Sequence, residues 1–210
     1  ATFATGTLET LHVWDAATLP DEPDVQLDGT NGLLFVSLGD RIERVELPGG
    51  SPLFFAGAGA IAPPGDGTVA LAPTRLGYDL GSQSLIVADV ARMGAIAVDD
   101  ETSFGVLLAS DTVGSGPVIE VPGGLAIETK PGKLVVCDGG AQPRLFEVDL
   151  TGGTRRIAFD VAGDPTFPSV PVVDVGWLPR RSVALVLLGG GLEALVALDV
   201  ASGQRVIVSR

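Results

Sequence analysis

The sequence predicts an all-β fold of the β-propeller type, a single domain over residues 1–210 with about four complete four-stranded antiparallel blades and a partial N-terminal one. The 210-residue chain contains 29 glycines and 15 prolines, a composition that favours many short strands and tight turns. Short apolar runs recur with a period near 50 residues, which is enough for four strands and their turns. No segment shows a 3.6-residue period of helix length.

The repeat is clearest in an apolar run that we assign to the second strand of each unit. These runs are Leu34–Leu38, Leu85–Asp89, Leu134–Asp138 and Ala184–Leu188, and their starts lie 51, 49 and 50 residues apart. The acidic residues that end the third strands lie 53, 50 and 50 residues apart: Glu46, Asp99, Asp149 and Asp199. Because two separate positions give the same period, we expect units at about 25–57, 74–110, 122–160 and 172–210.

The other strands of each unit follow from this alignment. First strands are expected at Val25–Asp28, Leu76–Asp79, Leu125–Glu128 and Val172–Leu178. Third strands are expected at 41–47, 95–100, 145–150 and 195–200, and fourth strands at 52–57, 105–110, 155–160 and 205–210. In the third unit, Phe146, Val148 and Leu150 alternate onto one face, and Leu145 stands apart from their register.

Charged residues near the ends of the third strands have a structural interpretation. The acids that end these strands, such as Asp149 and Asp199, are expected to accept hydrogen bonds from turn amides. Arg155 and Arg205 follow these two acids by six residues. We expect the arginines to pair with acids on adjacent strands.

The N-terminal segment, residues 1–24, fits the repeat less well. Asp15 resembles a third-strand acid, but it precedes Glu46 by only 31 residues. The segment is therefore either a partial blade or a closing segment that adds its strand to the last blade. Six blades would need about 300 residues at this period. The chain is accordingly a short propeller, an open arc, or a part that another chain completes.

Composition excludes several classes of function. The net charge of −13 argues against nucleic-acid partners and against docking to anionic lipid. A single cysteine, Cys137, excludes an internal disulfide and a cysteine-rich zinc site, and a single histidine, His12, excludes a multi-histidine metal site. No run reaches the roughly 18 apolar residues of a membrane span. The N-terminus has no signal-peptide pattern, although a chain that begins at Ala1 is either processed or a piece of something longer.

The repeat resembles that of known bacterial propellers. The elements that carry the resemblance are LVVCD with LFEVDLTGGTRRIAF, LDVASGQRVIVS, and the link SDTVGSGP at Ser110–Pro117. They are similar to the six-bladed NHL, TolB-like and gluconolactonase-like group, over most of residues 25–210. The resemblance implies a binding surface around a central channel and a periplasmic or extracellular location. Lactonases of this group hold a divalent metal with Glu, Asn and Asp facing the channel, which makes a lactonase-like hydrolase the alternative function.

Three acidic residues occupy the same place in the repeat, six residues before the second strand: Asp28, Asp79 and Glu128, with Leu178 in the fourth unit. Since the first strand lines the channel of a propeller, these acids are candidates for a ring that binds a hard cation such as Ca²⁺. The other interpretation is that each acid caps the turn that follows it, as Asp28-Gly29 suggests.

Two aromatic residues, Tyr78 and Trp177, lie one residue before this position. They either line the channel and stack on a flat ligand, or pack in the core between blades. We therefore expect a non-catalytic binding or protein-interaction scaffold that requires no cofactor, with a protein or small molecule as its ligand. The alternative is a metal-dependent hydrolase with one divalent cation at an acidic channel site around Asp79 and Glu128.

Overall fold

A computed structural model describes residues 23–57, 72–99, 105–127, 132–140, 143–160, 170–178, 183–190 and 193–209. These ranges form four four-stranded antiparallel sheets, so the predicted all-β propeller with four complete blades is confirmed. The predicted partial blade over residues 1–24 lies almost wholly outside the described residues. Among the described segments, no helix has the length and apolar character needed to cross a membrane.

Each blade consists of four consecutive strands that pair in chain order. Blade 1 contains β1 (Val25–Asp28), β2 (Leu33–Ser37), β3 (Arg41–Glu46) and β4 (Leu53–Gly57). Blade 2 contains β5 (Pro73–Asp79), β6 (Ser84–Asp89), β7 (Gly94–Asp99) and β8 (Gly105–Ala109). Blade 3 contains β9 (Pro122–Ile127), β10 (Lys133–Asp138), β11 (Arg144–Asp149) and β12 (Arg155–Asp160). Blade 4 contains β13 (Val172–Leu178), β14 (Val183–Leu188), β15 (Ala194–Asp199) and β16 (Arg205–Ser209).

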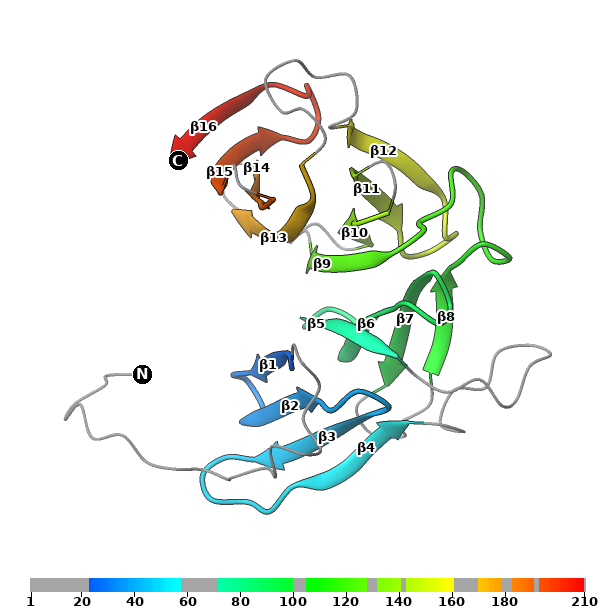
Figure 1. The fold of residues 1–210 in the computed structure, drawn as a ribbon. Coiled ribbons are helices and arrows are strands. Elements are labelled where there is room, and N and C mark those ends of the chain that lie inside the picture. Colours follow the sequence, from blue (N-terminus) through cyan, green and yellow to red (C-terminus); the bar gives the residue numbers. More distant parts are fainter. Residues whose placement is uncertain are drawn as a thin grey trace.

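The four blades follow one another round an arc, with the first strand of each blade on the inner side (Figure 1). Contacts between successive blades are made by these inner strands: β1 contacts β5, β5 contacts β9, and β9 contacts β13. Figure 1 also shows that blades 1 and 4 are the two ends of the arc. Within the described ranges, blades 2 and 3 therefore have a neighbouring sheet on both sides, whereas blades 1 and 4 each have one.

The strand bounds differ most from the prediction at the start of β5 and β9. These strands begin at Pro73 and Pro122, and not at Leu76 and Leu125. The pairing continues past a register shift between Pro73 and Arg75, and a similar shift occurs where β9 pairs with β10. The extra residue of such a bulge interrupts the alternation that a sequence pattern uses, while proline is tolerated as the first residue of a strand.

A second register shift recurs between the third and fourth strands of every blade. It follows Ile42, Ala95, Leu145 and Leu195, which are equivalent positions. Bulges of this kind increase the local twist of a sheet, so the outer strand of each blade is turned relative to the inner ones.

The hydrophobic core is divided into three clusters, one between each pair of successive blades. Leu145 and Phe146 show how a middle blade contributes to two of them. Leu145 packs toward blade 4, whereas its neighbour Phe146 packs toward blade 2, and both side chains are fully buried. Successive residues of a strand point to opposite faces, so Leu145 stands apart from the apolar alternation because blade 3 buries both faces.

The link from blade 2 to blade 3 is fixed by Arg155, which corrects the predicted ion pair of this residue. The Arg155 side chain is buried, and its Nε and Nη1 donate to the carbonyl oxygens of Pro117 and Val113 at 2.8 and 2.7 Å. A third donor, Nη2, lies 3.4 Å from the carbonyl oxygen of Gly116. Burial lowers the pKa of this guanidinium. Arg155 thus serves to hold the SDTVGSGP link against β12.

Candidate functional site

Asp28 ends β1 and holds the turn that follows. Its carboxylate is buried and accepts hydrogen bonds from the backbone N–H of Thr30 at 2.9 Å and of Asn31 at 3.4 Å. The side-chain amide of Asn31 donates to the second oxygen at 2.8 Å. This is the turn-capping arrangement that we considered from the sequence.

Asp79 ends β5 at the equivalent place in blade 2. Its Oδ1 accepts from the backbone N–H of Gly81 at 3.1 Å, and its Oδ2 accepts from the Ser82 hydroxyl at 2.8 Å. Asp28, Asp79 and Leu178 pair with the first residues of the second strands, so the structure places them at the same end of successive inner strands. Glu128 lies outside the described residues, and a cation ring that includes it stays a prediction.

A groove between blades 2 and 3 includes Asp79. Its volume is about 460 Å³. Its lining from blade 2 is Asp79, Gly81, Ser82, Ser84, Ile86, Ala97 and Leu108, and from blade 3 Gly132, Leu150 and Thr151. The apolar residues belong to or pack against the core cluster between these blades, and hydroxyl groups surround them. Within the described ranges, no three acidic, histidine or cysteine side chains gather as metal ligands would.

Tyr78 and Trp177 both contact core clusters. The Tyr78 ring stacks on Phe35 of blade 1, with the ring centroids 5.8 Å apart and the planes 16° from parallel. Trp177 packs against the cluster between blades 3 and 4, and its buried Nε1 has no acceptor among the described residues. These contacts are those of the core interpretation; a role in stacking on a ligand stays a prediction.

Two buried carboxylates that the sequence analysis did not single out, Asp89 and Asp138, end the second strands of the middle blades. Asp138 accepts from the backbone N–H of Val121 at 2.8 Å and of Gly140 at 3.1 Å, and Arg144 lies 3.4 Å away. The sequence feature that could have identified both residues is an acid at the end of an otherwise apolar run. In each case one of the backbone donors immediately precedes the first strand of the same blade. Each carboxylate therefore ties the end of the second strand to the start of the first strand, and we say that it closes the blade.

Asp89 makes the corresponding bonds in blade 2. It accepts from the backbone N–H of Ala72 and of Arg92, both at 2.9 Å. Burial raises the pKa of Asp89 and outweighs these hydrogen bonds, which lower it.

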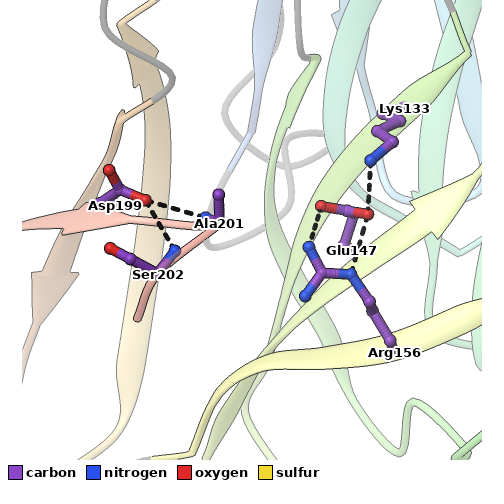
Figure 2. A network of polar contacts seen from close by, with 6 residues as sticks. All are labelled: Lys133, Glu147, Arg156, Asp199, Ala201 and Ser202. Carbon is purple, nitrogen blue, oxygen red and sulfur yellow. Dashed lines mark hydrogen bonds and ion pairs between the residues drawn. The ribbon is translucent and has the colours of Figure 1, made fainter. Parts of the chain in front are cut away.

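Two of the third-strand acids, Asp149 and Asp199, cap the turns that follow them, as predicted. Asp149 accepts from the backbone N–H of Thr151 at 2.8 Å. Asp199 accepts from those of Ala201 and Ser202 at 3.0 and 2.8 Å (Figure 2). Hydrogen bonds from the turn backbone lower the pKa of both carboxyl groups. The turn-capping role of these two acids is confirmed.

A charged triad lies on the surface of blade 3. Glu147 accepts from Lys133 at 2.8 Å and from Arg156 at 2.6 Å and 3.0 Å (Figure 2). Burial raises the pKa of Glu147, but the hydrogen bonds from Arg156 and Lys133 lower it overall. The triad joins β10, β11 and β12 and presents no free carboxylate for catalysis.

The open sheet faces of the end blades are the most distinctive surface. We call the side of a blade turned to the next blade its front face, and the opposite side its back face. The front face of blade 4 is formed by Gly176, Leu178, Leu185, Leu187, Leu195 and Val206, as the strand pairing shows. The back face of blade 1 is formed by Val25, Leu27, Leu34, Val36, Glu43, Val45 and Phe54.

Large apolar side chains on both faces are exposed. On the front face of blade 4, Val206 is 68% exposed and Leu187 is 41% exposed. On the back face of blade 1, the exposed fractions of Phe54, Val25 and Leu27 are 63%, 55% and 51%. Grouped exposed apolar residues indicate an interaction surface, whereas single ones are ordinary.

Solved structures with a similar fold include a chain in the crystal structure of a nidogen/laminin complex, which is 15% identical with a TM-score of 0.69. The alignment covers 89% of this chain and 64% of that one. Hydrazine synthase from Kuenenia stuttgartiensis is 15% identical with a TM-score of 0.63, and the match covers 97% of this chain and 53% of that one. A structural genomics protein of unknown function from Bacteroides thetaiotaomicron VPI-5482 is 13% identical with a TM-score of 0.59, covering 78% and 43%.

These likenesses show the β-propeller fold. The chain spans less than two thirds of the length of each of these three proteins. No protein-family model matches the sequence, and no curated protein matches it. Membership of the NHL, TolB-like or gluconolactonase-like group stays a prediction.

Proposed function

We propose that this chain is a non-catalytic, protein-binding scaffold that makes its contacts through the open faces of blades 1 and 4. The observation that carries the proposal is the exposure of Val206, Leu187 and Phe54 on sheet faces whose equivalents in blades 2 and 3 are covered by another blade. Covering such faces with protein removes apolar surface from water and is favourable.

Two further observations support a scaffold. The carboxylates of Asp28 and Asp79, candidates for a metal site, already accept hydrogen bonds from the turns that follow them. A propeller chain of similar fold occurs in a nidogen/laminin complex, which is a complex between proteins. A fold hosts many functions, so this likeness supports the proposal only together with the exposed faces.

The proposal is tested by sedimentation velocity of the purified chain over a wide concentration range, with and without EDTA. We expect concentration-dependent association that EDTA does not change and that Leu187→Asp weakens. Leu80→Asp is the matched control, because Leu80 is 64% exposed in the turn after β5 and lies on neither open face. A chain that stays monomeric at every concentration would contradict the proposal. A chelator-sensitive mass shift of one divalent ion in native mass spectra would favour the hydrolase alternative.

A further inference from the structure

Internal repetition defines which faces of this molecule are complementary. In every blade-to-blade contact, the front face of one blade packs against the back face of the next. In blade 2, the front-face residues Ile86, Ala88 and Ala95 meet Leu134, Val136 and Phe146 on the back face of blade 3. The contact from blade 3 to blade 4 uses the equivalent positions: Val135, Cys137 and Leu145 meet Ala184, Val186 and Val196. Among the described sheets, the two faces that no other sheet covers are the front face of blade 4 and the back face of blade 1.

A pair of equivalent glycines, Gly77 in blade 2 and Gly176 in blade 4, shows which packing contact blade 4 lacks among the described residues. A Cβ atom on Gly77, on the front face of blade 2, would lie 2.5 Å from Leu125 Cδ1 and 3.3 Å from Ile127 Cδ1, both on blade 3. Gly176 is the equivalent residue of blade 4, and a Cβ atom there would meet nothing within 4 Å. The first strand of a following blade would fill the space beside Gly176.

The residues that would fill this space are exposed on blade 1. Val25 and Leu27 are equivalent to Leu125 and Ile127, because each pair lies opposite the same two positions of the second strand. Leu125 is buried, whereas Val25 and Leu27 are about half exposed. Val36 and Val45, deeper on the same back face, are buried in the chain as it stands, so the accessible part is the β1 edge.

The aromatic stack between blades 1 and 2 gives the expected pairing across such a contact. Phe35 lies 5.8 Å from Tyr78. The residue equivalent to Phe35 in blade 4 is Leu185, and the residue equivalent to Tyr78 in blade 1 is Leu27. Both are leucines, and a leucine pair can replace a stacked aromatic pair across an apolar contact. Glu43 and Arg41 are charged residues of β3 on this back face, and they pair with each other at 3.0 Å.

We propose that the front face of blade 4 binds the back face of blade 1 of a second copy, with Val25 and Leu27 of that copy seated over Gly176. The inference rests on the proposed protein-binding function and specifies its partner and geometry. The contact is heterologous, because two different faces meet, so it joins copies head to tail.

Complementation between two variants tests this geometry. Leu27→Asp puts a charge on the back face of blade 1, and Leu187→Asp puts one on the front face of blade 4. Each variant keeps one intact face. We expect each variant alone to remain monomeric in sedimentation velocity, and an equimolar mixture to form a dimer that grows no further. Leu80→Asp should associate as the unmodified chain does.

Either of two results would overturn the head-to-tail contact: a variant that associates normally by itself, or a mixture that stays monomeric while the unmodified chain associates. Both leave the protein-binding function standing, because the unmodified chain still associates. Absence of association in the unmodified chain overturns the function and the geometry together. Circular dichroism and the urea midpoint check that both variants fold, as expected for side chains that are 51% and 41% exposed.

Thiol cross-linking gives a second measurement that does not depend on weakening the contact. A Leu185→Cys chain mixed with a Leu27→Cys chain should be joined by a short bis-maleimide, whereas Leu185→Cys with Leu80→Cys should not. The native Cys137 does not interfere, because it is fully buried and burial raises the pKa of its thiol to about 12. Cross-linking of Leu185→Cys only to itself would show a front-to-front dimer and overturn the proposal.

Discussion

The middle and end blades of this propeller are built from the same strands but bury them differently. Every residue of β6 in blade 2 is buried, and so is nearly every residue of β10 in blade 3. In blade 4, β15 alternates between buried and half-buried residues along its whole length. Among the described sheets, each middle blade packs between two others and each end blade against one. Equivalent apolar strands are therefore covered by sheets on both sides in the middle blades and on one side in the end blades.

The residue that ends the second strand also differs between the middle blades and the end blades. The second strands of blades 2 and 3 end in the buried acids Asp89 and Asp138. The equivalent residues in blades 1 and 4 are Leu38 and Leu188. Enclosed blades thus fasten the incoming link with a carboxylate, whereas the end blades place an apolar side chain there. Position in the arc, as well as position in the repeat, therefore determines what a residue does.

Truncating a phenylalanine should cost much more stability in a middle blade than in an end blade. Phe146→Ala removes a fully buried ring from the cluster between blades 2 and 3 and is expected to lower the free energy of unfolding by about 3–5 kcal/mol. Phe54→Ala, on the exposed back face of blade 1, should change it by less than about 0.5 kcal/mol. Urea unfolding followed by circular dichroism measures both. Similar losses for the two variants would show that blade 1 is covered as fully as blade 3.

Replacing the buried acid of a middle blade by the leucine found in the end blades should also lower the free energy of unfolding. Asp138→Leu leaves the amides of Val121 and Gly140 without this acceptor, and it removes the nearer of two carboxylates that pair with Arg144. We expect a loss of about 3 kcal/mol, because two backbone donors lose their hydrogen-bond acceptor and Arg144 loses its nearer ion-pair partner. The control is Leu188→Met, which conserves volume at the equivalent place and should cost less than about 1.5 kcal/mol. An Asp138→Leu chain as stable as the control would remove the fastening role of the acid.

The two equivalent glycines allow the comparison to be made at a single site. Gly77→Val would push a side chain into Leu125 and is expected to cost about 1–3 kcal/mol through overpacking. Gly176→Val meets open space, and a β-branched residue suits a strand, so the folding stability of the monomer should stay the same or rise slightly. Differential scanning calorimetry at low protein concentration distinguishes the two. A loss at Gly176 equal to that at Gly77 would mean that the face is already filled.

Much of the fold could be predicted because the apolar second strands recur at a regular spacing in the sequence. Enclosed strands such as Leu134–Asp138 are continuous apolar runs, and their spacing gave the period, the blade count and most strand bounds. The bulges could not be predicted, since an extra residue such as Ala158 is recognisable only from the pairing of β11 with β12. The open faces could not be predicted either. Ala184–Leu188 is as apolar as Leu85–Asp89, and Leu187 is exposed because none of the described sheets packs on the front face of blade 4.

The candidate site residues also fall into two groups: those whose role has a local sequence signature and those whose partners are distant in the sequence. Acids at turns have a local signature, so the capping roles of Asp149 and Asp199 followed from their spacing. The bonds of Asp138 to Val121 and of Arg155 to Val113 join segments that are far apart in the sequence. Such partners depend on how an inter-blade link runs over the blades, which no local pattern records.

The smallest expected effect is a difference in pH dependence between Asp89 and Glu147. The pKa of Asp89 is raised in the folded state, so the folded chain binds the proton more tightly than the unfolded chain. The contribution of Asp89 to stability is therefore present at low pH and is lost as the pH rises through the folded pKa. The pKa of Glu147 is lowered, so its contribution is present above the unfolded pKa and is lost as the pH falls through the folded pKa.

Substitution by the neutral amide isolates each contribution. Asp89→Asn should weaken the fall in stability with rising pH, and Glu147→Gln should weaken the loss of stability on acidification, each by roughly 1 kcal/mol, the usual size of one hydrogen bond. Urea midpoints measured from pH 3 to pH 7 test both, with the unmodified chain as reference. Identical pH profiles for the two variants would contradict the opposite shifts. Opposite profiles would show that desolvation governs the carboxylate that closes blade 2, whereas Lys133 and Arg156 govern the one on the surface of blade 3.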